Sequence, residues 1–391
     1  MVSPGFFYKA LRRRGVVFIT GVPDSLLKDF CAYVGVNSSP SSYMVAVNEG
    51  AAIALGAGFH FATGGIPLIF MQNSGLGNAV NPLLSLCDAN VYSIPALLLV
   101  GWRGEPGLHD EPQHITQGRL TLPLLQTLNI PHLVMEDSES AVSVQIDAAF
   151  RELKTQNAPF ALVVRKGTFT PYRLDGRDVG GNSEFHAKLS LSREEAIEEI
   201  ILSSPDDLFF STTGMASREL YELREKHCMG GGRDFLTVGS MGHASSIALG
   251  AALARPGAPI TCIDGDGSAL MHLGALAAIG AAKPRRLRHI LLNNGAHDSV
   301  GGQPTIAFDV DLAAIARASG YRRVFYADTR QDLRLALRAG DADGREGPVF
   351  IEVRVKTGAR PDLGRPKSSP VENKTAFMRH FREIGAEEAF Q

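Results

Sequence analysis

Short runs of β-forming residues alternate with helix-like stretches along the whole chain, and this alternation limits the possible folds more than any other feature. In the first half the runs are residues 16–20, 43–47, 66–71, 96–100 and 160–164. In the second half they are residues 208–211, 260–264, 289–293 and 349–355. Strands separated by crossover helices are typical of parallel sheets. We therefore predict an α/β fold of two doubly wound parallel-sheet domains.

A polar, glycine-rich stretch at residues 175–183 separates the two halves and has little hydrophobic periodicity. The next helix is expected to begin after Ser192, because Glu195 completes a capping box. A chain of 391 residues suits two domains of ordinary size. We predict domains at 1–175 and 190–391 with a linker between them. After the last strand, residues 356–374 are predicted to form a surface excursion before a closing helix at 376–388.

Charge and hydropathy exclude several classes of partner. The formal net charge is −2, so the chain has no basic field that would attract nucleic acid or an anionic membrane. No apolar run reaches the roughly 18 residues needed for a membrane span, and no N-terminal signal pattern is present. These features predict a cytoplasmic enzyme that acts on a small molecule.

The sequence Gly265-Asp266-Gly267-Ser268 directly follows one apolar run, and the next apolar run ends in Asn293-Asn294. Glycines let the backbone turn sharply and approach a diphosphate. Asp266 can give a carboxylate oxygen to magnesium, and Asn294 can give an amide oxygen. With one loop carbonyl, these are suitable protein ligands for an octahedral ion that also binds phosphate oxygens.

This order resembles the signature of the thiamine diphosphate-dependent enzymes, in which GDG is followed after roughly 25 to 30 residues by NN. The resemblance implies that magnesium is bound by Asp266, Asn294 and the carbonyl of Ala296. It also implies that the diphosphate is contacted by Gly265, Gly267 and Ser268. The alternative is an ordinary strand-to-helix turn, with which GDG alone would be compatible.

Two further turns resemble cofactor contacts of the same family. Met241, in Gly239-Ser240-Met241-Gly242, would be the bulky side chain that keeps the cofactor bent, and the Gly239 carbonyl would accept a hydrogen bond from the 4′-amino group. Met is more often simple core filler, which is the alternative for this residue. Thr213-Gly214-Met215 resembles the second diphosphate-contacting turn, at a helix N-terminus.

The family also requires a glutamate in the other domain, and Glu49 in Asn48-Glu49-Gly50 is the candidate. By resemblance, Glu49 would share a proton with N1′ of the pyrimidine and so activate the cofactor. Glu49 could instead be an acid that stabilises a helix N-terminus. The resemblance implies that Glu49 and the diphosphate site come from different subunits. It therefore implies a homodimer or a dimer of dimers with active sites at the subunit interface.

Four strings of residues resemble the short branch of the family, which has no central third domain, and the phosphonopyruvate decarboxylases within it. These strings are residues 21–25, 73–78, 101–105 and 294–299. Arg103, His109, Gln113, His114 and Arg119 are expected to cluster in one loop, where charge-assisted hydrogen bonds would bind a dianionic phosphonate. A solvated loop is the alternative for the histidines.

The resemblance places the substrate and the later proton transfers at Asp24, Ser25, Arg103, Gln113 and His114, with Glu49, Ser25 and His114 as the catalytic set. Asp24-Ser25 differs from the Gly-Asp of many pyruvate decarboxylases, and Gln113-His114 differs from their His-His pair. The implied reaction converts 3-phosphonopyruvate into phosphonoacetaldehyde and carbon dioxide, in the biosynthesis of a phosphonate natural product such as an antibiotic.

Other functions are compatible with parts of this pattern. Sulfopyruvate decarboxylases share much of it, often with the two domains as separate subunits, so fusion in one chain favours the phosphonate enzyme. A synthase that forms carbon–carbon bonds from the same cofactor-bound intermediate is a further alternative. A silent cofactor-binding subunit would be expected to lack Glu49 or the GDG motif, and both are present. A Rossmann dehydrogenase is excluded because no GxGxxG follows the first strand.

Overall fold

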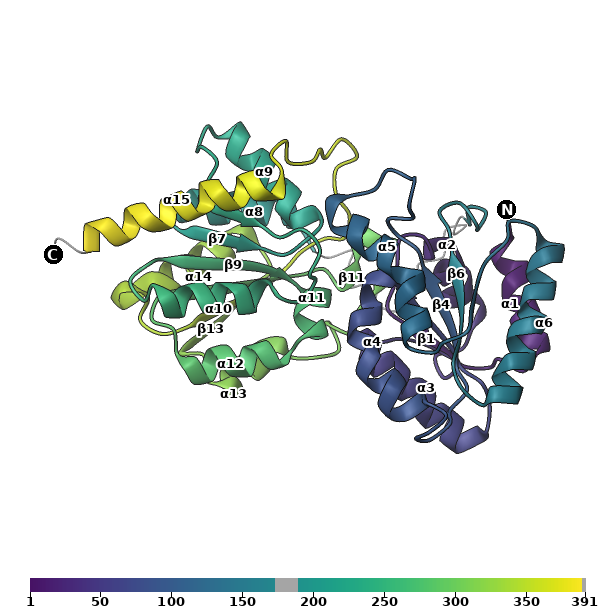
Figure 1. Ribbon diagram of the computed structural model, residues 1–391. Helices are drawn as coiled ribbons and strands as arrows, with labels where there is room; N and C mark the ends of the chain where they lie inside the picture. The colour runs from purple at the N-terminus through teal and green to yellow at the C-terminus, as the bar shows by residue number, and fades with distance from the viewer. Residues whose placement is uncertain (173–188, 389–391) are drawn as a thin grey trace. The chain divides into compact units, whose positions relative to one another are not determined.

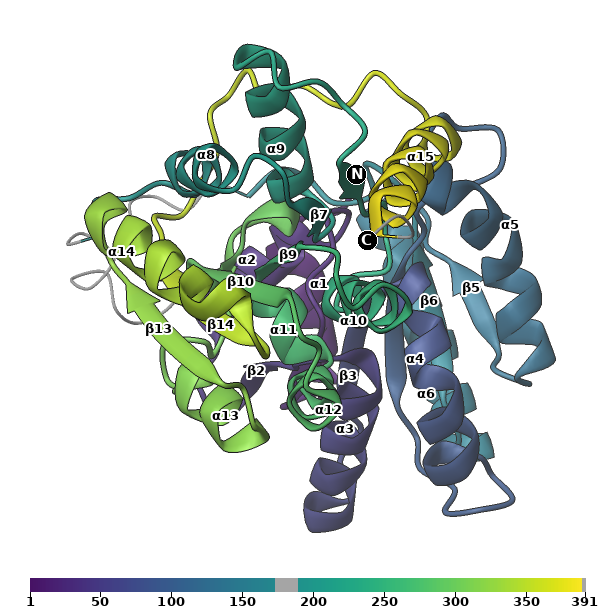
Figure 2. The same ribbon diagram turned by 90° about the vertical axis from the view of Figure 1, so that its left-hand side faces the viewer.

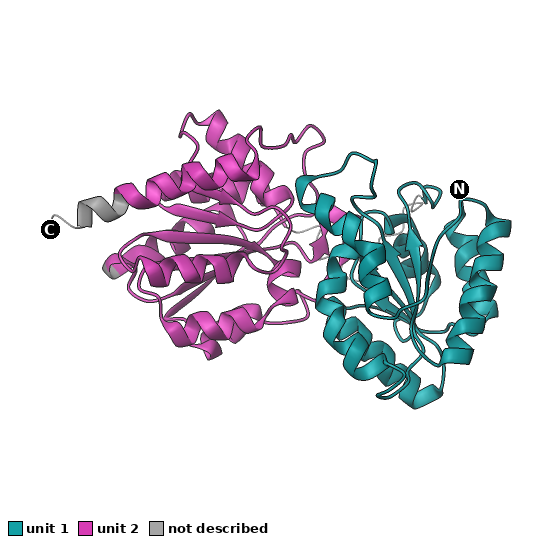
Figure 3. Ribbon diagram, viewed as in Figure 1, with its two compact units in different colours: residues 1–181 teal, residues 182–391 magenta. Residues whose placement is uncertain are grey.

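The computed structural model describes residues 1–172 and 189–388. The chain divides into two compact units, unit 1 (Met1–Gly181) and unit 2 (Asn182–Gln391), which Figure 3 shows in different colours. The linker predicted at residues 175–183 lies outside the described residues. The capping box predicted at the start of unit 2 is confirmed, because the Ser192 hydroxyl oxygen accepts from the Glu195 N–H and the Glu195 carboxylate accepts from the Ser192 N–H.

Unit 1 contains a six-stranded parallel sheet in its described part, with the order β2-β1-β3-β4-β6-β5 (Figure 1). Its strands are β1 (Ile19–Gly21), β2 (Tyr43–Val45), β3 (Leu68–Gln72), β4 (Leu97–Gly101), β5 (His132–Val134) and β6 (Phe160–Val164). Its α-helices are α1 (Pro4–Arg13), α2 (Lys28–Asn37), α3 (Glu49–Thr63), α4 (Leu76–Pro82), α5 (Pro112–Thr127) and α6 (Glu139–Gln156).

Unit 2 contains a second parallel sheet, with the order β13-β14-β10-β9-β7-β8. Its strands are β7 (Leu208–Ser211), β8 (Asp234–Leu236), β9 (Ile260–Gly265), β10 (Leu287–Asn293), β13 (Arg323–Ala327) and β14 (Val349–Arg354). A small antiparallel pair, β11 (Ala296–His297) and β12 (Gln303–Pro304), follows β10. Its α-helices are α8 (Arg193–Ser203), α9 (Met215–Lys226), α10 (Ala244–Ala254), α11 (Asp266–Met271), α12 (Gly274–Ala282), α13 (Leu312–Ser319), α14 (Arg330–Asp341) and α15 (Pro370–Glu388).

The two sheets have the same topology. Read from β8 to β13, the unit 2 sheet has the order β8-β7-β9-β10-β14-β13. When the six strands of each sheet are numbered along the chain, both sheets have the order 2-1-3-4-6-5. The chain therefore reverses its direction of winding at the same place in each unit, between the first and third strands. This agrees with the predicted fold class of two doubly wound parallel-sheet domains.

Helices cover both faces of each sheet. In unit 1, α1, α2 and α6 share one apolar cluster with the sheet, and α3, α4 and α5 share another. In unit 2, α8, α9 and α14 pack on one face, and α10, α12 and α13 lie on the other, as Figure 2 shows. Both faces are buried, so the central strands are continuously apolar. None of the described helices combines the length and apolar character of a membrane span.

The sequence missed three strands of the two large sheets, and all three lie at sheet edges. These strands are β5, β8 and β13. Edge strands have a neighbour on one side only, and β5 and β13 are largely half-exposed. β5 and β8 are only three residues long and so lack the apolar run by which the central strands were predicted, whereas β13 contains such a run after Arg323 and was still missed. The predicted strands overlap β1–β4, β6, β7, β9, β10 and β14.

The closing helix begins earlier than predicted. The sequence predicts a helix at residues 376–388, whereas α15 begins at Pro370. Ser369 and Glu372 form reciprocal hydrogen bonds between side chain and backbone, at 2.8 and 3.3 Å, with Pro370 between them. This is a capping box with proline in the first turn, and the polar character of residues 370–375 concealed it.

Candidate active site

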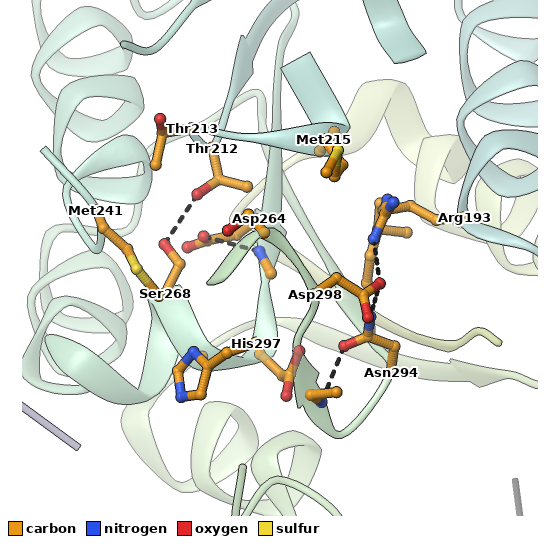
Figure 4. A pocket seen from close by; sticks show the side chains of 17 residues that line it. Arg193, Thr212, Thr213, Met215, Met241, Asp264, Ser268, Asn294, His297 and Asp298 are labelled. Carbon is orange, nitrogen blue, oxygen red and sulfur yellow. Dashed lines mark hydrogen bonds and ion pairs between the residues drawn. The ribbon is translucent and has the colours of Figure 1, made fainter. Parts of the chain in front are cut away.

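A pocket in unit 2 lies at the carboxyl ends of β7 and β9, where the winding of the sheet reverses. In open α/β sheets, ligands bind at this switch point. Figure 4 shows the lining side chains, which come from the loops after β7, β8 and β10, from the ends of β9 and β10, and from α8, α9 and α11. The predicted cofactor and metal residues among them are Met215, Met241, Gly265, Asp266, Gly267, Ser268, Asn294 and Ala296. Gly214 and Gly239 lie in the same loops but are not among the lining residues.

Asp266 begins α11 directly after β9 and is buried, with 2% of its surface exposed. Burial raises the pKa of its carboxyl to about 7, although a hydrogen bond from the Thr305 hydroxyl and several backbone N–H groups act in the opposite direction. Within the described residues no ion pair reaches this carboxylate. A divalent cation would supply the missing positive charge, so the surroundings of Asp266 fit a metal site.

The other two predicted metal ligands follow β10. Asn294 is buried, its Nδ2 donates to Asp298 Oδ2 at 2.7 Å, and its Oδ1 accepts from the Ala296 N–H at 3.1 Å. The carboxylate of Asp266, the amide oxygen of Asn294 and the carbonyl of Ala296 form a set of hard oxygen donors. Such a set matches magnesium rather than a metal that prefers sulfur or imidazole.

Ser268 connects the turns that surround the pocket. Its Oγ accepts from the Gly242 N–H and from the Thr212 hydroxyl, each at 3.0 Å, so its own hydroxyl hydrogen is available for a ligand. The neighbouring Thr213 hydroxyl accepts from the Gly239 N–H at 3.1 Å. The three loops that the sequence assigned to the cofactor are therefore tied to one another by hydrogen bonds.

Gly267 is required by close packing. A Cβ at this position would lie 2.6 Å from His297 Cε1 and 3.4 Å from Met241 Cε. Met241 therefore lies beside this glycine, and its side chain lines the pocket that Figure 4 shows. Burial lowers the pKa of His297 to about 4, so this imidazole is neutral at pH 7.

Glu49 is the first residue of α3 and is 5% exposed. Its Oε2 accepts a hydrogen bond from Asn78 Nδ2 at 2.8 Å. Gly75 leaves space for the carboxylate, since a Cβ there would lie 2.3 Å from Glu49 Oε1. Asn48 caps the helix with its side chain, so Glu49 is not needed as the cap. These contacts hold a buried carboxylate in one position.

Asp24 lies at the equivalent switch point of unit 1, between β1 and β3. Its Oδ2 accepts from Gln72 Nε2, the last residue of β3, at 2.7 Å, and its Oδ1 accepts from the Leu26 N–H at 2.9 Å. Burial raises the pKa of this carboxyl despite these hydrogen bonds. Asp24 is thus fixed at the carboxyl ends of β1 and β3, and it is not among the residues that line the pocket containing Ser25 and Arg103.

A second relevant pocket lies in unit 1, beside Asp24. It is lined by Ser25, Leu26, Trp102, Arg103, Gly104, Glu105, Leu108, His109, Asp110 and Lys166. Arg103 donates to Ser25 Oγ at 2.9 Å from Nη1 and binds Asp110 with the rest of its guanidinium group. Burial of Asp110 opposes its ionisation, but Arg103 and two backbone N–H groups hold the pKa of this carboxyl well below its usual range. Arg103 is therefore already paired, and an anion would have to bind beside Asp110.

The predicted single loop of polar residues is wrong in part. Gln113, His114 and Arg119 lie in helix α5, because Pro112 begins a helix there. Arg119 is exposed and is not among the residues that line the pocket. His114 is 8% exposed, and burial followed by the charge of Arg103 lowers its pKa.

Two buried atoms of α5 lack a hydrogen-bond partner within the described part of the chain, namely His114 Nδ1 and Gln113 Oε1. Buried polar atoms are nearly always paired, so such atoms indicate a ligand or water. The other ring nitrogen, His114 Nε2, lies 3.4 Å from Gln113 Nε2. The neutral imidazole therefore retains one nitrogen that can bind or release a proton.

Several residues near the pockets were not predicted as site residues. In unit 2 they are Arg193, Thr212, His297 and Asp298, and in unit 1 Lys166. Asp298 lies four residues after Asn294, a spacing that could have indicated a contact. Arg193 and Lys166 reach their pockets from distant segments, and no local sequence signal identifies them.

Comparison with known proteins agrees with this geometry. Residues 5–123 match the N-terminal and residues 213–353 the C-terminal TPP-binding domain of thiamine pyrophosphate enzymes. The phosphonopyruvate decarboxylase of Streptomyces hygroscopicus is 37% identical over 99% of this chain and 95% of its own length, and that of Streptomyces viridochromogenes is 36% identical over 95% and 93%. The sulfopyruvate decarboxylase of Methanosarcina acetivorans is 28% identical over 89% and 90%. With both domains matched and near-complete coverage of these relatives, the chain belongs to the thiamine pyrophosphate enzymes and, within them, to the phosphonopyruvate decarboxylase family.

Proposed function

We propose that the protein is a thiamine diphosphate- and magnesium-dependent decarboxylase that converts 3-phosphonopyruvate into phosphonoacetaldehyde and carbon dioxide. The observation that carries this proposal is the unit 2 pocket, which brings Asp266, Asn294, Ala296, Ser268 and Met241 together at the switch point of the sheet. The choice of substrate rests on two phosphonopyruvate decarboxylases that are 37% and 36% identical over 99% and 95% of this chain. The biosynthesis of a phosphonate natural product is the setting that this reaction implies, and the cytoplasm is its predicted location.

The residues of unit 2 would hold the cofactor. Asp266, Asn294 and the Ala296 carbonyl would bind magnesium, and the free hydroxyl hydrogen of Ser268 would donate to a diphosphate oxygen. The first turn of α9, which contains Met215, presents backbone N–H groups that favour an anion. Bound thiamine diphosphate supplies a nucleophilic carbon and an electron sink for the loss of carbon dioxide.

The residues of unit 1 would handle protons and the substrate. Glu49, buried and fixed by Asn78, would hold a proton at N1′ of the pyrimidine. The neutral His114 could give or accept a proton at Nδ1. Arg103, His109 and Lys166 line a pocket beside Ser25 and would donate hydrogen bonds to a phosphonate group. Glu105 and Asp110 line the same pocket, so the phosphonate would bind beside the Arg103–Asp110 pair.

Arg103→Ala is expected to raise KM for phosphonopyruvate by about tenfold to hundredfold, because a hydrogen bond to a charged group contributes roughly 1.5–3 kcal/mol. The turnover number is expected to change much less. Arg119→Ala is a matched control, since Arg119 is exposed on α5 outside this pocket. Steady-state kinetics on both variants, with thermal unfolding to check the fold, measure the effect. An unchanged KM would assign Arg103 to its ion pair with Asp110 alone.

Phosphorus NMR tests the reaction itself. Purified protein with thiamine diphosphate, magnesium and phosphonopyruvate is expected to produce phosphonoacetaldehyde only when the cofactor is present. Sulfopyruvate and pyruvate, followed by reduction of the aldehyde product, are assayed in parallel. Turnover of sulfopyruvate alone would keep the cofactor and reject the phosphonate substrate. Inactivity on all three would favour a carbon–carbon-forming synthase or a silent subunit.

Sulfopyruvate decarboxylation is the second candidate, because one specific observation supports it. The match with the Methanosarcina acetivorans sulfopyruvate decarboxylase covers 89% of this chain and 90% of that relative. Both catalytic domains therefore occur in that single chain too. Fusion of the domains therefore does not favour the phosphonate enzyme, contrary to the sequence-based expectation. The lower identity of this relative, 28% against 36–37%, leaves phosphonopyruvate as the first choice.

We further infer that the active enzyme is at least a homodimer, in which Glu49 of one subunit serves the diphosphate site of another. Co-expression of Glu49→Gln and Asp266→Ala subunits with different tags tests this. The purified heterodimer is expected to have about half the wild-type activity, because one of its two symmetry-related sites would be intact. Each homodimer of a single variant is the control and is expected to be nearly inactive. A heterodimer without activity would indicate that both residues act within one subunit.

A further inference from the structure

Asp298 lines the unit 2 pocket and accepts several hydrogen bonds. A single oxygen, Oδ2, accepts from Asn294 Nδ2 at 2.7 Å, from Arg193 Nη1 at 2.9 Å and from the Gly358 N–H at 3.0 Å. Figure 4 shows Arg193, Asp298 and Asn294 in a row along the pocket wall. An oxygen with three N–H donors has no lone pair left for a metal ion. Asp298 Oδ2 is therefore not a candidate ligand.

The contact with Asp298 decides which way the Asn294 amide faces. An ionised carboxylate can only accept hydrogen bonds, so the atom of Asn294 beside it must be the NH₂ group. The amide oxygen then lies on the other side of the group, where it accepts from the Ala296 N–H. A reversed amide would direct N–H hydrogens at a bound cation. Asp298 thus selects the orientation in which Asn294 can bind magnesium.

Arg193 holds Asp298 in place and is itself held. Its Nε and Nη2 form a bidentate pair with Glu219 of α9, at 2.8 and 2.9 Å, and its Nη2 also donates to the Gly358 carbonyl at 3.3 Å. Arg193 and Glu219 are 7% and 1% exposed. A charge network buried in this way has one favourable arrangement, since each partner is costly to leave unpaired.

We propose that Asp298 and Arg193 are positioning residues of the magnesium site, which fix the amide of Asn294 with its oxygen available to the metal. This inference rests on the proposed function, because it concerns the same cofactor site. Partners of this kind typically change metal affinity by about 10- to 100-fold when they are removed. A purely structural tie between α8, α9 and the loop after β10 would instead change the stability of the protein and leave the metal dependence unaltered.

Asp298→Asn tests the proposal, since it keeps the size of the side chain while removing the charge and the obligate acceptor. Calorimetric titration of thiamine diphosphate into the whole protein, at a series of magnesium concentrations, gives the concentration of magnesium needed for half-maximal cofactor binding. This concentration is expected to rise about 10- to 100-fold in Asp298→Asn, and saturating magnesium is expected to restore cofactor affinity. Asp206→Asn, with an exposed side chain, is the matched control.

Other outcomes would overturn the inference. An unchanged magnesium requirement, or weaker cofactor binding that saturating magnesium does not restore, would make Asp298 a structural residue. If Asp298→Asn does not fold, Arg193→Lys provides the same measurement. Lysine retains the positive charge beside Glu219 but lacks the second guanidinium nitrogen that donates to Asp298. An unchanged magnesium requirement in this variant would reject the proposal. Wild-type protein without magnesium-dependent cofactor binding would reject the proposed function instead.

Discussion

Glu49→Gln is expected to lower turnover of phosphonopyruvate by about 100-fold to 10,000-fold, the range that a positioned proton-transfer group contributes. Glutamine has nearly the same size, so the space left by Gly75 and the hydrogen bond with Asn78 can be retained. It cannot share a proton with the pyrimidine ring in the way a carboxyl group does. Cofactor affinity is therefore expected to change by only a few-fold.

Two measurements separate these effects. The first is the turnover number under saturating cofactor, and the second is the rate at which the C2 hydrogen of the bound cofactor exchanges with deuterium, read by proton NMR after acid quench. Both are expected to fall together in Glu49→Gln. Glu136→Gln, in an exposed position of unit 1, is the control and is expected to match wild type. Normal exchange and turnover in Glu49→Gln would remove Glu49 from the mechanism and leave it a helix N-terminal acid.

The sequence predicted the interior of both sheets because burial on two faces produces continuous apolar runs. The runs at 160–164 and 208–211 coincide with β6 and β7. Edge strands were harder to find in this way, because β5 and β8 are only three residues long and the apolar part of β13 follows an arginine on a half-exposed edge, although β2, also at an edge, was predicted. The shared strand order of the two units also could not be predicted, because it depends on which strands pair and not on where they occur.

The cofactor loops were predicted because their chemistry is local. The GDG turn and Asn294 each directly follow a strand, and parallel strands bring their carboxyl ends to one edge. Contacts between distant segments were missed for the opposite reason. Arg193 reaches Asp298 from the start of α8, and Lys166 reaches the Arg103 pocket from the loop after β6. Likewise, nothing in the residue types revealed that Arg103 would be paired with Asp110.

Asp266→Ala is expected to abolish magnesium-dependent binding of thiamine diphosphate. Asp266 would supply the only carboxylate among the three proposed ligands in the pocket, so its loss leaves two neutral oxygens for a dication. In wild type, cofactor at 100 times its Kd is expected to stabilise the folded protein by about 2.7 kcal/mol. In thermal unfolding this corresponds to a rise in Tm of several degrees. The variant is expected to show no rise at the same concentrations of cofactor and magnesium.

The comparison must separate loss of the metal site from damage to the fold. The Tm of the cofactor-free variant is the reference, because removal of a buried carboxyl that lacks an ion pair within the described residues is not expected to destabilise unit 2 severely. Asp206→Ala, with its exposed side chain, is expected to keep the full rise. The expected effects of Asp266→Ala and Asp298→Asn differ, because high magnesium should restore cofactor binding only in Asp298→Asn. If Asp266→Ala retained the wild-type rise and the wild-type magnesium requirement, the metal would have to bind elsewhere, and the reading of the GDG turn as a magnesium site would be wrong.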